Sequence, residues 1–266
     1  MKRYSEFLAV ATAAGPVTIE TYIDGDPGVL DVVVLPSYGR DGGEDFDAFA
    51  AALAGAGFRA LRPQPRGVAG SSGPMTDVSI EELADDVAQV IERCGAGRPA
   101  VVLGHAFGNF VARVIATSRP ELVRAVILAA ASTQAPPPEI NGAPFRAGDP
   151  TLPEEERLAA LRLAFFAPGH DPSIWLSGWY PQTLAMQHTA VVNADLDQYW
   201  GAGHVPILEI LAALDPFHPE DQWNDLREQL GDRVTTVVVE GASHALFPEQ
   251  PAAVADEVIG YLRTLG

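Results

Sequence analysis

Cysteine is almost absent from this sequence, with Cys94 the only one among 266 residues. A single thiol cannot form an intramolecular disulfide, so no disulfide framework holds the fold together. We interpret Cys94 as a packed or half-exposed helix residue. The histidines His188, His204 and His218 also lack the spacing of a metal site, so we expect neither a metal ion nor another cofactor.

Long apolar runs and positive charge are scarce as well. No stretch reaches the roughly 18 apolar residues that a membrane span needs. Lys and Arg number 17 against 35 Asp and Glu, giving a formal net charge of −18. Such a surface repels phosphate backbones and anionic lipids, so we expect no nucleic-acid or membrane partner. The remaining expectation is a small-molecule substrate bound by a monomer or homodimer.

The amino-terminal segment has two interpretations. Lys2-Arg3 followed by the apolar residues Phe7–Ala11 faintly resembles a secretory signal. Glu6 precedes a run that is too short for such a signal, and residues 17–23 alternate in polarity. We therefore predict two strands joined by a turn at Ala14-Gly15-Pro16, and a cytoplasmic protein.

After this hairpin, strand and helix patterns alternate along the chain. The β-branched run Val32–Leu35 is typical of a strand buried on both faces. We predict further strands at 58–61, 101–103, 125–128, 206–211 and 234–240. Helices are predicted over 45–55, 79–95, 107–117, 154–166, 220–230 and 252–265. This alternation predicts an α/β fold, with a parallel sheet covered by helices.

The alternation fails between about residues 132 and 203, where the sequence is rich in proline, alanine and aromatic residues. We therefore predict a core made of residues 1–132 and 204–266, interrupted by an inserted helical segment of residues 133–203, called the insertion below. Hydrophobic residues make up 47% of the chain, enough for a large buried core.

One segment has the pattern of a catalytic turn. The predicted strand 101–103 runs directly into Gly104-His105-Ala106-Phe107-Gly108, and a predicted helix follows. Glycines two residues before and after a central position allow a sharp strand-to-helix turn that exposes the central side chain. This is the geometry of the nucleophile elbow G-x-S-x-G. The central residue here is Ala106, which has no lone pair and cannot attack a substrate.

Together with four other motifs, this elbow resembles the α/β-hydrolase family over essentially the whole chain. The other motifs are Leu35–Gly39 at the oxyanion loop, Pro65–Gly67 with Gly70–Ser72 at the Arg-Gly loop, Asp215 at the acid position and Gly241–His244 at the histidine position. The chain order of nucleophile position, acid and histidine is that of the family. The resemblance implies a mostly parallel eight-stranded sheet with helices on both faces, and makes the insertion the family's cap.

The chemistry of the acid and the histidine follows from their positions. Asp215 and His244 each come after a predicted buried strand, so both lie at the carboxyl edge of the sheet, where α/β proteins bind ligands. A carboxylate that accepts from one ring nitrogen leaves the other as a base near neutral pH. The resemblance further implies that Ala106 occupies the nucleophile position. It also assigns the oxyanion hole to the backbone N–H groups of Tyr38 and Phe107.

Aromatic residues of the insertion are candidates for an apolar ligand pocket. We expect His105, Trp175, Trp179, Tyr180 and Trp200 to contact the substrate. The alternative for the aromatic residues is that they only pack the insertion against the core.

The missing hydroxyl leaves three interpretations open. In the first, which we favour, the protein is an enzyme for a small, largely apolar ester, lactone or amide, and His244 with Asp215 acts without a covalent nucleophile. In the second, Ala106 is an engineered replacement of a catalytic serine. In the third, the protein binds a small molecule without catalysis, or is a cofactor-free lyase or oxygenase. We favour the first because the acid, the histidine and the elbow glycines are all retained.

Overall fold

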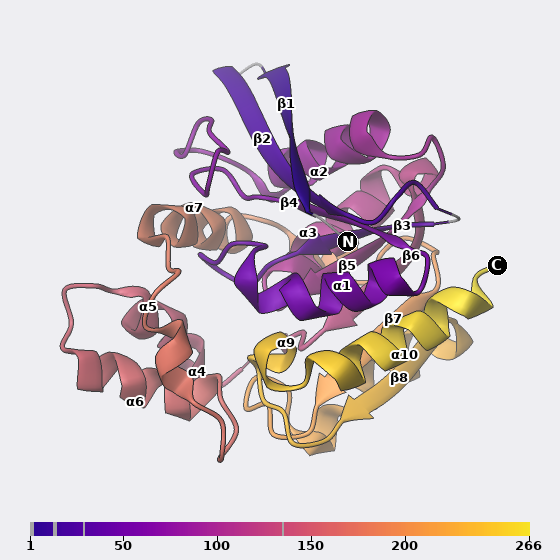
Figure 1. Ribbon diagram of the computed structural model, residues 1–266. Helices are drawn as coiled ribbons and strands as arrows, with labels where there is room; N and C mark the ends of the chain where they lie inside the picture. The colour runs from indigo at the N-terminus through magenta and orange to yellow at the C-terminus, as the bar shows by residue number, and fades with distance from the viewer. Residues whose placement is uncertain (1–2, 13–14, 29, 135) are drawn as a thin grey trace.

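A computed structural model describes residues 3–12, 15–28, 30–134 and 136–266. The described strands form one eight-stranded sheet in the order β1-β2-β4-β3-β5-β6-β7-β8 (Figure 1). Their bounds are β1 Tyr4–Thr12, β2 Gly15–Asp24, β3 Asp31–Leu35, β4 Arg59–Pro63, β5 Ala100–His105, β6 Val123–Ala129, β7 Ile207–Ala212 and β8 Val234–Val239. β2 is antiparallel to β1 and β4, whereas β4, β3, β5, β6, β7 and β8 are parallel. The predicted mostly parallel sheet is confirmed.

Helices cover both faces of this sheet. Outside the insertion they are α1 Asp47–Gly55, α2 Ile80–Cys94, α3 Gly108–Ser118, α8 Asp225–Leu230, α9 Leu246–Glu249 and α10 Pro251–Thr264. Short 3-10 helices lie at η1 Glu44–Phe46, η2 Pro120–Leu122, η5 Glu220–Gln222 and η6 Gly231–Arg233. Two predicted helices are therefore divided, 45–55 into η1 and α1 and 220–230 into η5 and α8.

The β-branched strands contribute side chains to two hydrophobic cores, one on each face of the sheet. Successive side chains of a strand point to opposite faces of the sheet. Val32 and Val34 accordingly pack with α1 and α10, whereas Val33 and Leu35 pack with α2 and α3. Figure 1 shows α1 and α10 side by side in front of the sheet, with α2 and α3 behind it. The sheet is thus buried on both faces, as the apolar run predicted.

The amino-terminal residues form the predicted hairpin. β1 and β2 pair from Tyr4 opposite Ile23 to Thr12 opposite Gly15. In the predicted turn, Ala14 lies outside the described residues, whereas Gly15 and Pro16 belong to β2. None of the described helices is long and apolar enough to cross a membrane.

The insertion lies between β6 and β7 and has a small core of its own. Its helices are α4 Pro138–Asn141, α5 Ala143–Gly148, α6 Glu154–Ala164 and α7 Pro181–Val192, with η3 Pro172–Trp175 and η4 Leu196–Tyr199. Leu161, Phe165 and Trp175 pack together there and contact Phe217 and Ala245 of the core. The insertion is therefore attached to the carboxyl ends of β7 and β8 by apolar contact.

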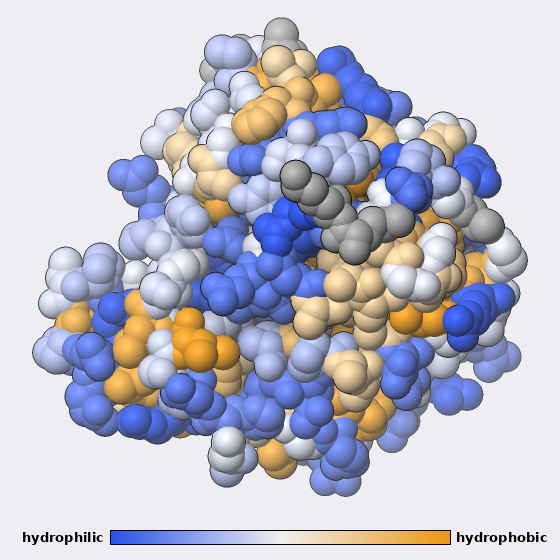
Figure 2. All heavy atoms as spheres, viewed as in Figure 1, coloured by the Kyte–Doolittle hydropathy of each residue, from blue (hydrophilic) through white to orange (hydrophobic). Residues whose placement is uncertain are grey.

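The outer surface is mostly hydrophilic on the face seen in Figure 2, with hydrophobic side chains gathered over the region of α4, α5 and α6. Phe145 of α5 and Leu163 of α6 are among the exposed large hydrophobic residues.

Candidate active site

The turn between β5 and α3 is sharp and depends on its two glycines. Ala106 has a φ of 49°, which is rare for a residue with a side chain. A Cβ on Gly104 would lie 2.3 Å from the carbonyl carbon of Gly108. A Cβ on Gly108 would lie 2.6 Å from the carbonyl oxygen of Leu35. Only glycine fits at these two positions, and the turn presents the Ala106 methyl group at the end of the sheet.

His244 and Asp215 form a buried hydrogen-bonded pair. Nδ1 of His244 lies 2.9 Å from Oδ2 of Asp215, and their residues are 4% and 3% exposed. The backbone N–H of Phe217 donates to the other carboxylate oxygen at 2.9 Å. Because an ionised carboxylate only accepts hydrogen bonds, this network places the proton of His244 on Nδ1 and leaves Nε2 as an acceptor.

The loop that carries His244 is fixed by a second carboxylate. Glu249 accepts hydrogen bonds from the backbone N–H groups of Ser243 and Ala167, each at 2.6 Å. The Ser243 hydroxyl donates to the carbonyl of Leu214 at 3.0 Å, which joins this loop to the one carrying Asp215. Burial raises the pKa of the Glu249 carboxyl above its ordinary value. Glu249 thus ties the histidine loop to the insertion.

Ala106 and His244 line the same cavity, of about 630 Å³. Its walls combine aromatic and aliphatic side chains with polar ones, among them the carboxylates of Asp195 and Asp197 and the amides of Gln134 and Asn141. The lining includes Ser37, Tyr38, Phe107, Phe110, Ser132, Thr133, Gln134, Phe165, His188, Trp200 and Phe217. The Ala106 methyl group and the His244 imidazole therefore line the same cavity.

Two backbone N–H groups are available beside Ala106. Tyr38 and Phe107 both line the cavity, and their rings pack with centroids 4.7 Å apart. Neither backbone N–H donates to any residue in the described part of the chain. Phe107 is also the residue at the amino-terminal end of α3, where the helix dipole favours negative charge. With no acceptor among the described residues, both N–H groups are free to donate to a ligand.

Three of the aromatic residues expected to contact a substrate do not line this cavity. Trp175 is 1% exposed, lies in the core of the insertion and donates from Nε1 to Asp45 at 3.0 Å. Trp179 donates from Nε1 to the carbonyl of Trp175 at 2.5 Å. The hydroxyl of Tyr180 lies 3.4 Å from Asp41. Only Trp200 of the four lines the cavity. The side chains of the other three attach the insertion to the loop after β3, which is the alternative left open by the sequence.

His105 is likewise behind the site rather than in it. Its Nε2 lies 2.8 Å from the backbone carbonyl of His244, and its ring packs against Phe46 and Phe247. Burial, together with the neighbouring His244, lowers the pKa of His105 to about 4. The neutral ring therefore supports the histidine loop through a hydrogen bond and is not among the cavity residues.

Sequence reasoning missed the aromatic residues closest to His244. The ring of Phe217 lies 4.1 Å from the His244 ring and that of Phe165 lies 5.6 Å away, centroid to centroid. Phe217 follows Asp215 by two residues, and that proximity was the available signal. Phe165 belongs to the insertion, and no pattern distinguishes it from the other aromatic residues there. Among the described residues, no group of His, Cys, Asp and Glu is arranged to hold a metal ion.

Comparisons with known proteins agree with the fold. The model of the alpha/beta hydrolase family matches residues 32–257. No curated protein matches the chain at a significant level. A thermophilic esterase from Thermogutta terrifontis superimposes with a TM-score of 0.81 at 20% identity, over 98% of this chain and 99% of that one. An enol-lactonase from Burkholderia xenovorans LB400 gives 0.76 at 22% identity, covering 96% and 100%. A bromoperoxidase from Bacillus anthracis gives 0.76 at 20% identity, covering 97% and 100%. At such identities, these structures show the fold.

Proposed function

The chain belongs to the alpha/beta hydrolase family, and we propose that it is an enzyme acting on a small, largely apolar carbonyl compound. The substrate class is an ester, lactone or amide. His244 with Asp215 acts as acid and base, and no covalent intermediate forms at Ala106. The observation that carries this proposal is the 2.9 Å hydrogen bond between Nδ1 of His244 and Asp215, with the imidazole lining the same cavity as the Ala106 methyl group.

Hydrolysis by this arrangement needs a water molecule in place of a serine hydroxyl. Nε2 of His244 takes a proton from the water while the water oxygen bonds to the carbonyl carbon. The carbonyl oxygen becomes an oxyanion and accepts from the N–H groups of Tyr38 and Phe107, each of which contributes about 3 kcal/mol. The tetrahedral intermediate then collapses and the bond to the leaving group breaks. The leaving oxygen or nitrogen takes the proton from His244, which gives an acid and an alcohol or amine.

The cavity offers polar partners for that water. A water molecule in a largely apolar site needs two or more hydrogen-bonding groups. The residues Ser37, Ser132 and Thr133 line the cavity and carry hydroxyl groups. Ala106 lacks the oxygen that a serine would place at the elbow, which leaves that volume to the water.

We further propose that the insertion, residues 133–203, is the cap of the hydrolase core formed by residues 1–132 and 204–266. It contributes Phe165, His188 and Trp200 to the cavity walls. The rings of Phe165 and Trp200 give the cavity apolar surface, which favours a substrate with a hydrophobic body, and Asp195 and Asp197 of the insertion add carboxylates to the same walls.

The test is to measure the turnover of a panel of aryl esters and lactones by the parent protein and by His244→Ala. We expect the variant to lose a factor of about 10²–10⁴ in kcat, as is typical when a general base is removed. His204→Ala is the control, because His204 is exposed and lines no part of this cavity. If the parent protein instead binds these compounds saturably without turning them over, and His244→Ala binds them equally well, the protein is a binding protein.

A second experiment restores the hydroxyl. We expect Ala106→Ser to be labelled by a fluorophosphonate at residue 106 and the parent protein to remain unlabelled, since only the variant carries a nucleophile. A folded variant that resists labelling would show that elbow, oxyanion hole and His244 are not in register. Ester hydrolysis by Ala106→Ser alone would favour a serine hydrolase whose nucleophile has been replaced.

A further inference from the structure

The insertion holds the loop after β3 by its backbone. The N–H of Gly39 donates to Oε1 of Gln187 at 2.7 Å, and the carbonyl of Gly39 accepts from the N–H of Tyr180 at 2.8 Å. Both hydrogen-bonding groups of Gly39 therefore bind residues of the insertion. Gly39 directly follows Tyr38, which lines the cavity and whose N–H is one of the two proposed oxyanion donors.

Because peptide groups are planar, the hydrogen bond between Gly39 and Gln187 also affects the orientation of the preceding residue, Tyr38. The N–H of Gly39 belongs to the peptide plane after Tyr38, and the N–H of Tyr38 belongs to the plane before it. Only the φ and ψ angles of Tyr38 separate the two planes. Fixing the N–H of Gly39 in one direction therefore restricts the direction in which the N–H of Tyr38 points.

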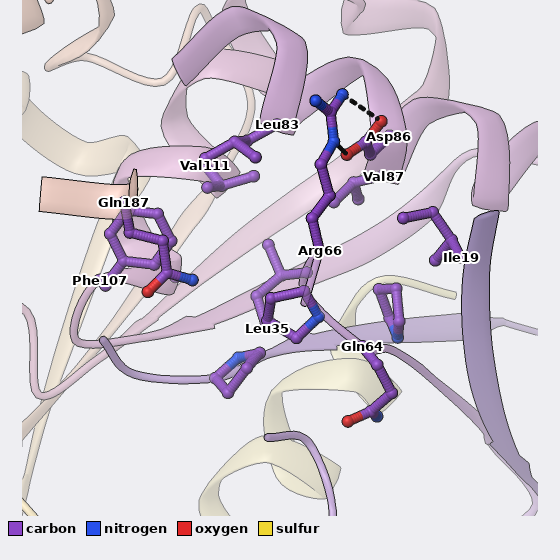
Figure 3. A pocket seen from close by; sticks show the side chains of 14 residues that line it. Ile19, Leu35, Gln64, Arg66, Leu83, Asp86, Val87, Phe107, Val111 and Gln187 are labelled. Atoms are coloured by element: carbon purple, nitrogen blue, oxygen red, sulfur yellow. Dashed lines mark hydrogen bonds and ion pairs between the residues drawn. The ribbon is translucent and has the colours of Figure 1, made fainter. Parts of the chain in front are cut away.

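The side chain that fixes it is buried beside a void. Gln187 of α7 is 1% exposed. It lines a cavity of about 50 Å³, together with Leu35, Pro36 and Phe107 (Figure 3). Figure 3 shows Gln187 next to Phe107, with the ion pair of Arg66 and Asp86 across the cavity. A void removes packing contacts from the residues around it. The hydrogen bond that Gln187 accepts from the Gly39 N–H is therefore the directional contact that this side chain makes beside the void.

Arg40 provides a third attachment between the loop after β3 and the insertion, and this attachment involves Trp175 and Trp179. Its guanidinium lies over the ring of Trp175 at 4.3 Å and near that of Trp179 at 5.3 Å. It donates to the carbonyl of Ser177 at 2.7 Å and to Asp45 at 2.9 Å. These two indoles therefore bind the residue that follows Gly39, which is why they are absent from the cavity walls.

We propose that Gln187 is a positioning residue that sets the oxyanion hole from the insertion. It holds the peptide between Tyr38 and Gly39 so that the Tyr38 N–H points into the cavity. The insertion then determines reactivity as well as access, because displacing α7 would release one oxyanion donor. The effect of Gln187 on the reaction rate rests on the function proposed above, whereas its effect on the backbone geometry of Tyr38 and Gly39 can be tested without that function.

The experiment uses the Ala106→Ser protein and the rate constant of its labelling by a fluorophosphonate, whose phosphoryl oxygen occupies the oxyanion hole. Gln187→Met removes the acceptor at similar side-chain length, and we expect a fall of about 100-fold or more, as for the loss of one oxyanion donor. Gln187→Glu keeps an acceptor oxygen, so its labelling rate constant should stay within a few-fold of that of Ala106→Ser with Gln187 unchanged. Gln182→Met is the matched control, because Gln182 is exposed on the same helix.

For an ester substrate, the same variants should separate kcat from KM. Loss of an oxyanion donor acts on the transition state, so Gln187→Met should lower kcat and change KM little. An unchanged labelling rate in folded Gln187→Met would overturn the proposal, and so would an equal fall in Gln182→Met. If Gln187→Met does not fold, Gln187→Asn, one methylene shorter, takes its place with the same expectations.

A separate readout distinguishes failure of this proposal from failure of the proposed function. In the protein with Ala106 retained, amide NMR signals of Tyr38 and Gly39 should shift in Gln187→Met, and the Gly39 N–H should exchange faster with solvent. If Ala106→Ser is not labelled, the proposed function fails while this readout still decides the geometry. Unchanged Tyr38 and Gly39 signals would overturn the positioning role.

Discussion

Ala106 lies at the centre of the turn between β5 and α3, in a backbone conformation that alanine rarely adopts. Its φ of 49° is unfavourable for any residue with a Cβ, and such backbone strain typically costs about 1–3 kcal/mol. Strain of this kind is found chiefly at functional sites, where the surrounding structure holds it in place. The turn is therefore more than a connection between β5 and α3, although the side chain at its centre is a methyl group.

His105 gives a pH dependence with a definite sign. Burial lowers its pKa in the folded protein to about 4 from the ordinary 6.5. Between these values the unfolded chain binds the proton and the folded protein does not. The free energy of unfolding should therefore fall as the pH falls from about 6.5 to about 4, by up to roughly 3 kcal/mol from this residue. Above about 6.5, the contribution is fully retained.

This prediction is checked by urea denaturation at several pH values for the parent protein and for His105→Gln, which keeps an N–H donor but cannot titrate. The difference in unfolding free energy between the two should change over this pH window, in favour of the variant at low pH. A constant difference from pH 7 to pH 4 would show that His105 titrates normally.

At the scale of elements, the close approach of β5, α3 and β3 creates the site. The elbow glycines bring α3 against the end of β5 and against Leu35 of β3. The two backbone N–H groups that we propose as oxyanion donors belong to neighbouring segments, Phe107 at the start of α3 and Tyr38 in the loop after β3. The distance between them is set by packing that has no room for a methyl group at either glycine.

We expect Gly104→Ala and Gly108→Ala to lower the unfolding free energy by about 2 kcal/mol or more, because the added Cβ would overlap backbone atoms. Gly260→Ala is the matched control. Gly260 lies inside α10 with nothing within 4 Å of an added Cβ, so alanine should stabilise the protein by about 0.5–1 kcal/mol. Chemical denaturation of the three variants measures these changes. Equal effects in all three would contradict the tight packing of the elbow.

At the scale of the whole molecule, charge determines which partners are unsuitable. The net charge of −18 makes the folded protein repel polyanions and repel itself. Several buried arginines pair with carboxylates inside the protein, as Arg59 does with Asp31 and Arg66 with Asp86, and these contribute no basic surface.

We therefore expect no binding to duplex DNA or heparin at low ionic strength, measured by gel shift and by column retention. Raising NaCl to about 0.2 M should raise the thermal unfolding midpoint, because salt screens the self-repulsion. Retention on heparin, or a midpoint that falls over this salt range, would indicate a basic surface that the net charge does not show.

Much of the fold and part of the candidate site follow from the sequence by itself. The β-branched runs determine which strands are buried on both faces, and Gly104 and Gly108 allow the sharp turn from β5 into α3. The order of strands places Asp215 and His244 after neighbouring strands, and the structure pairs them at 2.9 Å. These features depend on local patterns, and local patterns are what a sequence displays directly.

Only the tertiary structure decided which side chains face the cavity and which hold the insertion in place. Trp175 and Trp179 contact Arg40, whereas Phe165 of the same insertion lines the cavity, and nothing in their sequence positions distinguishes these three residues. The hydrogen bond between Gly39 and Gln187 joins residues 148 positions apart. Such contacts depend on how the insertion packs on the core, and that packing is a property of the whole set of apolar surfaces that must be buried together.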